Sequence, residues 1–375
     1  MQALSRTRAN RVEQGRADDA GAGMETVTYE DVVGAARRIA GHVLRTPVLE
    51  ISPGLVLKLE QLQHSGSFKA RGAFNRILSA GRLPDSGVIA ASGGNHGLAV
   101  AYAARALGVR AEIFVPEVTS PVKVAGLRAL GAEIRQTGAI YAEAAHAAAE
   151  RAVTTGALQV HAYDQPEVIA GQGTIGLEIV AQTGGVDTVL VAVGGGGLVA
   201  GITVGTGAPP PSTPPALPAP EPVPEAWPGL EPAPALRPGP GPAPGPGPAR
   251  KPGSVPRIVA VEPERIPTLH AALKAGEPVP VEVGGVAADA LGATRLGRTA
   301  YDICSRAGVH SVLVTDDAIV AARRTLWERH RVVAEHAGAT AYAALLSGAY
   351  VPGPGERVAV VVCGSNTDPA TLTLA

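Results

Sequence analysis

The sequence predicts an α/β protein with parallel sheets, and three features of the chain support this fold class. Short apolar runs alternate with segments of helical character through most of its length, which is typical of strands joined by crossover helices. The run at 189–193 is continuous and rich in valine, as expected of a strand buried on both faces. Glycine-rich turns follow this run and the run at 88–91, where a strand would lead into its helix.

Length and composition allow one large or two ordinary domains, because the chain has 375 residues, of which 46% are hydrophobic and 17% charged. The 32 Lys and Arg residues balance the 33 Asp and Glu residues, so neither nucleic acid nor a membrane surface is an expected partner. A small neutral metabolite fits this charge better. Cys304 and Cys363 form no disulfide framework, and the N-terminal residues lack the apolar core of a signal peptide. We therefore expect a cytoplasmic protein.

The N-terminal part is expected to begin with a disordered leader at residues 1–27. Thr28 is then expected to cap a helix that runs through Val43, because acidic residues follow it and apolar residues recur on one face. A short strand is expected at 55–59, and the turn after it leads into a helix that begins around Lys69.

From Gly87 the chain alternates regularly between strands and helices. The expected elements are a strand at 88–91, a helix at 95–107, a strand at 111–115, a helix at 120–130, a strand at 132–135, a helix at 140–154 and a strand at 157–160. Ser120 before a proline is a favourable helix start, with a capping hydroxyl at the N-cap. We expect these elements to form a small domain at 87–161, inserted into a large domain formed by 28–86 and 162–375.

The large domain resumes with a helix at 166–181 and the strand at 189–193. A helix that begins at Leu198 is expected to end by Gly205, where a Pro, Ala and Gly tract begins. Because proline has no backbone N–H and the tract offers little apolar surface, we expect a disordered insertion at 205–256. The remaining expected elements are strands at 258–261, 311–314 and 357–362 and helices near 294–307, 317–330 and 337–346.

Lys69 is the first candidate for chemistry. It lies within Gly66–Gly72, where a glycine-rich turn becomes a helix, and its neighbours are small or aromatic. Such neighbours would remove water from the ammonium and lower its pKa from about 10.4. The lysine is therefore a candidate nucleophile or base, and from this segment alone an ordinary lysine in a first helical turn is the alternative.

Two glycine-rich turns are candidate anion sites. Gly194–Gly197 places backbone N–H groups at the positive end of a helix, which suits a phosphate. It lacks the ending of a nucleotide P-loop and the spacing of a dinucleotide site, so a smaller phosphate compound is expected. The turn at 92–97 combines amides, a hydroxyl and a carboxamide, which suits a carboxylate. The alternatives are close packing for the first turn, and helix capping by Asn95 with a structural His96 for the second.

Taken together, these stretches resemble the pyridoxal-phosphate-dependent serine/threonine dehydratases of the tryptophan synthase β-like fold family. The matching stretches are Lys58-Leu59-Glu60 with Gly66–Gly72, then Ala91–Gly97, then Gly194–Leu198, with secondary matches at 163–174, 261–264 and 363–368. The resemblance covers about Thr28 to Leu374 apart from the proline tract. It implies a fold-type-II enzyme, with pyridoxal 5'-phosphate between two open parallel-sheet α/β domains.

The resemblance also assigns roles to residues. Lys69 becomes the catalytic Schiff-base lysine and Phe68 a neighbour of the cofactor ring, while Asn95 becomes the partner of the phenolic oxygen. Cys363 stands against the pyridine nitrogen, unless it is a buried small residue that closes a strand. The phosphate would be held by Gly194, Gly195, Gly196, Gly197 and Leu198. The substrate carboxylate would be bound by Ser92, Gly93, Gly94, Asn95 and His96.

The implied reaction is β-elimination, in which L-threonine gives 2-oxobutanoate and L-serine gives pyruvate, each with ammonia. A neutral thiol at the pyridine nitrogen does not enforce a pyridinium and so favours elimination over deeper carbanion chemistry. The resemblance also leads us to expect a homodimer or homotetramer. Two alternatives stay open: another elimination or replacement enzyme of this fold, such as a hydroxyaspartate dehydratase or a cysteine synthase, and a non-catalytic scaffold whose proline tract binds partners.

Two departures from related enzymes carry further expectations. Racemases of this family place a serine where this chain has Gly93, so we expect no appreciable racemisation. Some relatives bind a divalent cation through a glutamate matching Glu262 and an acidic residue six positions later, where this chain has Thr268. We therefore expect no metal site, because a hard cation needs several oxygen ligands.

Overall fold

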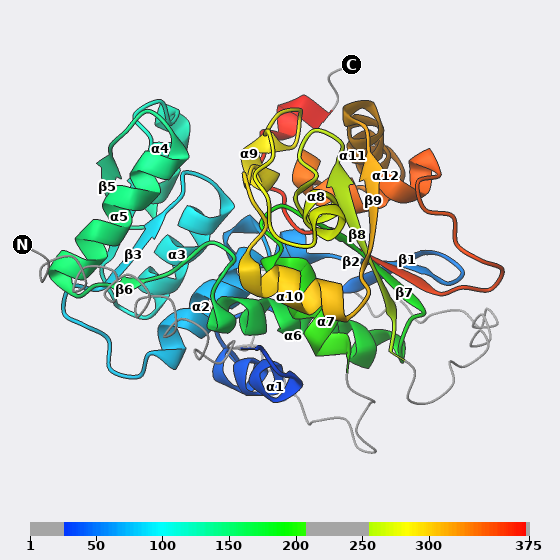
Figure 1. The fold of residues 1–375 in the computed structure, drawn as a ribbon, viewed down its shortest axis with the longest axis horizontal. Coiled ribbons are helices and arrows are strands. Elements are labelled where there is room, and N and C mark those ends of the chain that lie inside the picture. Colours follow the sequence, from blue (N-terminus) through cyan, green and yellow to red (C-terminus); the bar gives the residue numbers. More distant parts are fainter. Residues whose placement is uncertain (1–25, 208–254, 373–375) are drawn as a thin grey trace, which may run out of the picture.

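Two β-sheets organise the part of the chain that the computed structural model describes, residues 26–207 and 255–372 (Figure 1). The larger sheet has the strand order β1 (Val48–Ser52), β2 (Leu55–Lys58), β10 (Val358–Val361), β7 (Thr188–Ala192), β8 (Arg257–Pro263) and β9 (His310–Val314). The smaller sheet has the order β5 (Glu133–Gln136), β4 (Ala111–Val115), β3 (Val88–Ala91) and β6 (Leu158–Gln159). The α/β class expected from the sequence is confirmed.

All neighbouring strands are parallel except β1 and β2, which pair antiparallel. The larger sheet is therefore parallel, as expected, apart from this one pair at its edge. Only Pro53 and Gly54 connect the two strands, and Gly54 has a φ of +78°. A link this short can make a hairpin, whereas a parallel pair needs a long crossover.

Helices pack around both sheets, which lie in the two lobes seen in Figure 1. They are α1 (Tyr29–Arg38), α2 (Lys69–Ser79), α3 (Asn95–Ala106), α4 (Pro121–Ala129), α5 (Tyr141–Thr155), α6 (Pro166–Thr183), α7 (Gly197–Thr206), α8 (Thr268–Ala275), α9 (Ala288–Leu291), α10 (Arg298–Arg306), α11 (Asp316–His330) and α12 (His336–Ser347). Short 3-10 turns occupy Glu60–Leu62, His64–Gly66 and Pro369–Leu372. Within the described ranges, none of these helices combines the length and apolarity that a membrane span requires.

The helices α1 and α4 show which of the expected helix caps and ends the structure contains. The Thr28 side chain accepts a hydrogen bond from the Asp31 N–H and completes a capping box, as expected. The helix ends at Arg38 and not at Val43, and Gly41 in the following turn has a φ of +78° that a helix cannot contain. The Ser120 side chain makes no capping bond to α4, so that expectation is wrong.

The packing of α6 against α7 corrects the expected start of the insertion. Gly205 lies inside α7, and a Cβ at this position would meet the Gly173 carbonyl oxygen at 2.1 Å. The glycine permits close helix packing and does not end the helix, which continues to Thr206. The remainder of the expected insertion, 208–254, and most of the expected leader, 1–25, lie outside the described residues. The boundaries of the two expected domains stay a prediction.

A buried cluster of four charges ties the larger sheet to α2 and α6. The Arg71 guanidinium pairs with Glu60 at 2.8 Å and with Glu178 at 2.7 Å, and the Lys58 ammonium lies 2.5 Å from Glu178. The side chains of Lys58, Glu60 and Arg71 are completely buried. Because Arg71 lies in the first turn of α2, this cluster fixes the start of the helix that carries Lys69.

Candidate active site

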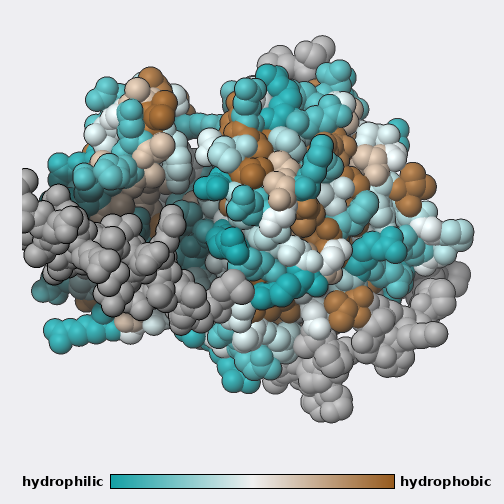
Figure 2. Space-filling view, viewed as in Figure 1, coloured by the Kyte–Doolittle hydropathy of each residue, from teal (hydrophilic) through white to brown (hydrophobic). Residues whose placement is uncertain are grey.

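The candidate site lies where strands of both sheets end at their carboxyl termini. Turns that follow β3, β7 and β10 meet the first residue of α2 there, the usual position of ligands in parallel α/β sheets. An inner pocket and an outer cavity of about 500 Å³ share Lys69, Asn95 and Tyr163 in their walls. Figure 2 shows the recess between the two lobes from outside.

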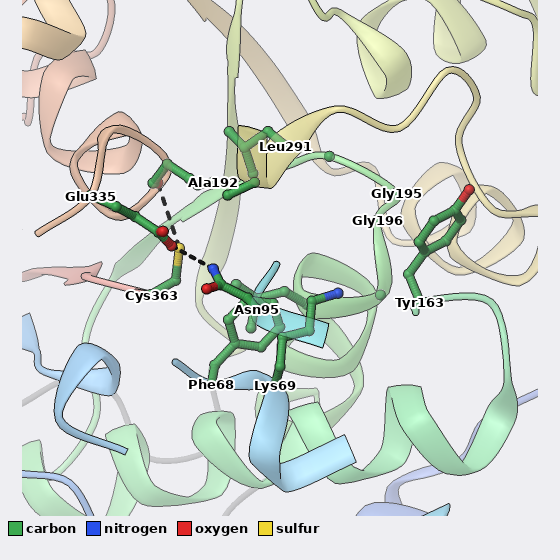
Figure 3. Close-up of a pocket in the computed structure, with 15 residues that line it drawn as sticks. Phe68, Lys69, Asn95, Tyr163, Ala192, Gly195, Gly196, Leu291, Glu335 and Cys363 are labelled. Atoms are coloured by element: carbon green, nitrogen blue, oxygen red, sulfur yellow. Dashed lines mark hydrogen bonds between the residues drawn. The ribbon is translucent and has the colours of Figure 1, made fainter. Parts of the chain in front are cut away.

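The structure brings together all the site residues expected from the sequence. The inner pocket is lined by Phe68, Lys69, Asn95, Gly194, Gly195, Gly196, Gly197, Leu198 and Cys363 (Figure 3). The outer cavity is lined by Ser92, Gly93, Gly94, Asn95 and His96, together with Lys69. Their placement is compatible with the roles expected above, which stay proposals.

Lys69 offers its amine to the inner pocket. Its Nζ donates a hydrogen bond to the Ala162 carbonyl oxygen at 2.6 Å and lies 5.2 Å from the centre of the Phe68 ring. Desolvation lowers the pKa of Lys69 to about 8. At pH 7 about one molecule in ten therefore carries a neutral amine there, far more than for an exposed lysine.

The glycine turn after β7 presents backbone N–H groups without partners. Among the described residues, no acceptor binds the N–H groups of Gly195, Gly196, Gly197 or Leu198. The carbonyl groups of the same turn are satisfied elsewhere, since the Gly194 oxygen accepts from the Thr268 hydroxyl and the Gly195 oxygen accepts from the Gly297 N–H. N–H groups at the start of α7 that lack an acceptor in the described part of the chain suit an anion, and the assignment of this turn to a phosphate stays a proposal.

This turn requires glycine at two positions for different reasons. A Cβ at Gly195 would lie 2.2 Å from the Tyr163 ring. Gly196 has a φ of +91°, and a Cβ there would also meet Leu296 and Ala300 at 2.7 Å. A side chain at either position would displace the turn and its N–H groups.

The turn after β3 forms a second group of N–H donors, facing the outer cavity. The N–H groups of Gly93, Asn95 and His96 have no acceptor within the described part of the chain. The His96 Nε2 is bonded to the Val160 carbonyl oxygen at 2.9 Å, and burial lowers the pKa of His96 to about 3. His96 is therefore neutral, and the backbone carries the anion-binding character of this turn.

Cys363 follows β10 and closes the inner pocket. Its thiol donates to the Ala337 carbonyl oxygen at 3.5 Å, and burial raises its pKa well above that of an ordinary cysteine. The group that it offers to the pocket is thus a neutral thiol.

Sequence reasoning missed Glu335 as a residue of this pocket. Glu335 precedes α12, is 7% exposed and accepts a hydrogen bond from the Asn95 side-chain nitrogen at 2.6 Å. Burial raises the pKa of Glu335 to about 7. One feature of the sequence could have identified it, because Glu335 is the only carboxylate in the mostly apolar segment 332–345. Tyr163, which packs on Gly195, was likewise not expected in the pocket wall.

The Glu262 carboxylate, where some related enzymes hold a cation, is occupied by protein donors. It accepts from the N–H groups of Leu269 at 2.7 Å and His270 at 2.8 Å, and from the Ser311 hydroxyl at 2.9 Å. Within the described residues, no cluster of three or more His, Cys, Asp or Glu side chains is arranged to bind a metal ion.

The chain is similar to enzymes of one family over nearly its whole length. The model of a family described as pyridoxal-phosphate dependent enzymes matches residues 16–226 and 248–364. The chain is 33% identical to the L-threonine ammonia-lyase of Thermotoga maritima, over 91% of this chain and 76% of that protein. It is also 33% identical to the phenylserine dehydratase of Ralstonia pickettii, over 93% of this chain and 97% of that protein. A solved structure of a threonine deaminase from T.th. superposes with a TM-score of 0.73 at 33% identity, covering 91% of this chain and 99% of that one.

Proposed function

Because the chain belongs to the pyridoxal-phosphate-dependent enzymes, we propose that it is an ammonia-lyase that converts L-threonine, L-serine or both into 2-oxobutanoate or pyruvate and ammonia. One observation carries this proposal. The Lys69 amine lines a pocket together with the turn at 194–198, in which several N–H groups have no acceptor among the described residues. The outer cavity shares Lys69 with this pocket and is lined by the turn at 92–96, which carries further N–H groups of this kind. The first group suits a phosphate, and the second suits the carboxylate of an amino acid.

The inner pocket fits pyridoxal phosphate. The N–H groups of Gly195–Leu198 would hold its phosphate, and the Lys69 amine would hold it covalently. The Asn95 amide and the neutral Cys363 thiol would face its ring. The bound cofactor supplies an electron sink that makes the α-hydrogen of an amino acid acidic.

The side chains and backbone then perform the remaining steps. N–H groups of the turn at 92–96 bind the substrate carboxylate and orient the α-carbon. The Lys69 amine is released when the substrate amine takes its place, and, neutral in part because its pKa is about 8, it then takes the α-proton. Loss of the β-hydroxyl as water and hydrolysis of the resulting enamine give the keto acid and ammonia.

The outer cavity favours substrates with an uncharged group on the β-carbon. Besides Lys69, the charged residues that line it are Lys123 and Asp289, and these two form an ion pair with each other. A second carboxylate, as in 3-hydroxyaspartate, would therefore compete with Asp289 for Lys123. Val118 and Tyr141 also line this cavity, are exposed and provide apolar surface.

This apolar wall and the cavity volume of about 500 Å³ favour a second candidate substrate, a β-hydroxy amino acid with an aryl group. The similarity to a phenylserine dehydratase supports it. Keto-acid release from L-threonine, L-serine, 3-phenylserine and 3-hydroxyaspartate, compared at equal concentrations, tests both candidates. We expect faster keto-acid release from L-threonine, L-serine and 3-phenylserine than from 3-hydroxyaspartate. A protein without a visible absorbance band that borohydride bleaches, and without keto-acid release, would contradict the proposed function.

We expect dehydration without appreciable racemisation. Gly93 has no side chain to serve as an acid or base in the outer cavity, and a Cβ there would already lie 3.0 Å from the Thr119 methyl group. Chiral chromatography of reactions with L-serine should show pyruvate and no comparable D-serine. Formation of D-serine at a rate near that of pyruvate would mean that another group protonates the opposite face.

We also expect activity to survive treatment with EDTA. Glu262 already accepts four hydrogen bonds, one of them from the hydroxyl of Thr268, which stands six residues later and supplies no charge. A hard cation would have to replace these donors without a second carboxylate. The measurement compares keto-acid release before and after chelation and after addition of magnesium. A large loss that magnesium restores would contradict this expectation.

We further propose a cytoplasmic homodimer or homotetramer. The resemblance to the serine/threonine dehydratases and the nearly neutral charge of the chain support this assignment. Sedimentation of the full chain tests the oligomeric state, and a monomer at all concentrations would contradict it.

A further inference from the structure

The Asn95 side chain is held at both ends by other side chains. Its amide nitrogen donates to Glu335 Oε1 at 2.6 Å, and its amide oxygen accepts from the Asn366 side-chain nitrogen at 2.7 Å. Figure 3 shows Asn95 and Glu335 side by side near Cys363 at one side of the inner pocket. The orientation of the amide therefore depends on two neighbours.

Both neighbours select the same orientation. The nitrogen of Asn366 also donates to the Ser65 carbonyl oxygen at 2.8 Å, and a carbonyl oxygen can only accept. Both N–H bonds of Asn366 are thereby used, so the oxygen of Asn95 must face Asn366. An ionised Glu335 can also only accept, and it requires the nitrogen of Asn95 on its own side. The second N–H of Asn95 is left for the pocket.

The backbone around this pair is shaped to allow these contacts. Ser65 has a φ of +61°, which is uncommon for a residue other than glycine. A Cβ at Gly66 would lie 2.4 Å from Asn366 Oδ1, and a Cβ at Gly364 would lie 2.1 Å from Glu335 Oε1. The Ser365 N–H donates to the Gly66 oxygen at 2.9 Å and joins the two segments. Glycines thus make room for both partners of Asn95.

We propose that Glu335 is a positioning residue, which in its ionised form holds Asn95 with an amide N–H directed at the cofactor ring. This inference rests on the proposed function, because it concerns the group that faces the bound cofactor. Protonation of Glu335 replaces a charge-assisted hydrogen bond with a weaker neutral one and loosens Asn95. The ionisation of Glu335 thereby controls the hydrogen bond that the cofactor receives.

The surroundings place this ionisation near neutral pH. Glu335 is buried, and Asn95 is its one side-chain donor within the described residues. Burial raises its pKa to about 7, against the lowering effect of Asn95. The other titratable and charged groups that face it or its pocket are Asp289, which raises the pKa, Lys123 and Arg323, which lower it, and Cys363, Lys69 and Tyr163, which line the pocket.

Absorbance spectra of the cofactor-loaded enzyme test the inference. Wild-type spectra are recorded between about pH 5.5 and about pH 9, and the visible band should change over this range with a midpoint near pH 7. Glu335→Gln keeps an acceptor for Asn95 but cannot ionise, so this transition should disappear while the band remains. Glu356→Gln is the matched control, because Glu356 is a partly buried carboxylate bonded to Thr188 and Tyr350 away from the pocket. It should leave the transition unchanged.

A second variant keeps the inference testable if Glu335→Gln fails to fold. Asn366 is exposed, so Asn366→Ala should fold, and it removes the other bond that orients Asn95. It should shift the band in the direction that acid shifts the wild type. A transition that persists in Glu335→Gln, or a spectrum unchanged in Asn366→Ala, contradicts the inference alone. A wild type that binds no pyridoxal phosphate contradicts both the inference and the proposed function.

Discussion

Replacing Lys69 with alanine should lower turnover by more than about 10³-fold, because the change removes both a covalent attachment and a proton acceptor. The fold should persist, since the Lys69 amine makes one hydrogen bond, to the Ala162 carbonyl oxygen, at the surface of a preformed pocket. Keto-acid release and the visible cofactor band measure the two consequences, and both should be lost.

The control for this variant is Lys274→Ala, which removes an exposed lysine from α8 and should leave both signals unchanged. Far-ultraviolet circular dichroism of the two variants should coincide with that of the wild type. Residual turnover of Lys69→Ala within about tenfold of the wild type would exclude Lys69 as the base, because a difference that small is about 1.4 kcal/mol of activation free energy.

Replacing Arg71 with methionine should lower the free energy of unfolding by about 3 to 5 kcal/mol, the usual cost of breaking a buried ion pair. Arg71 pairs with both Glu60 and Glu178, and its side chain is completely buried. Without it, Lys58 alone remains to balance two carboxylates. Urea denaturation of cofactor-saturated protein measures the change, since at saturation cofactor binding contributes equally to the stability of wild type and variant.

The matched control is Arg110→Met. Arg110 pairs with Glu133 at 3.1 Å, but its side chain is 68% exposed, so the loss should be about 1 kcal/mol or less. Equal losses in the two variants would mean that the buried cluster contributes no more than a surface pair. A loss confined to Arg71→Met supports its role in fixing the first turn of α2, where Lys69 lies.

The sequence alone predicted the fold class, most elements and those residues of the candidate site that lie in the two glycine-rich turns or next to Lys69, but not Glu335 or Tyr163. The valine-rich run at 189–193 overlaps β7, whose five residues are all buried, because a strand covered on both faces has no polar side to interrupt it. The glycine turns and Lys69 could be located because anion binding and a reactive amine need particular residue types at the start of a helix. Local signals failed where packing decided, as at Gly205, which brings α6 and α7 together within a helix.

Only the tertiary structure decided which groups meet. Asn95 lies 240 positions before Glu335 and 271 positions before Asn366. Their contacts depend on the turn after β3, the segment between α11 and α12, and the loop after β10. Glu60 and Glu178 likewise meet Arg71 only because α2 packs on α6. A carboxylate has the same local signature whether it is solvated or buried, since burial and hydrogen-bond partners come from distant segments. The sequence therefore predicts which lysine and which turns form the candidate site, whereas the charge and orientation of the groups around them follow from the packing.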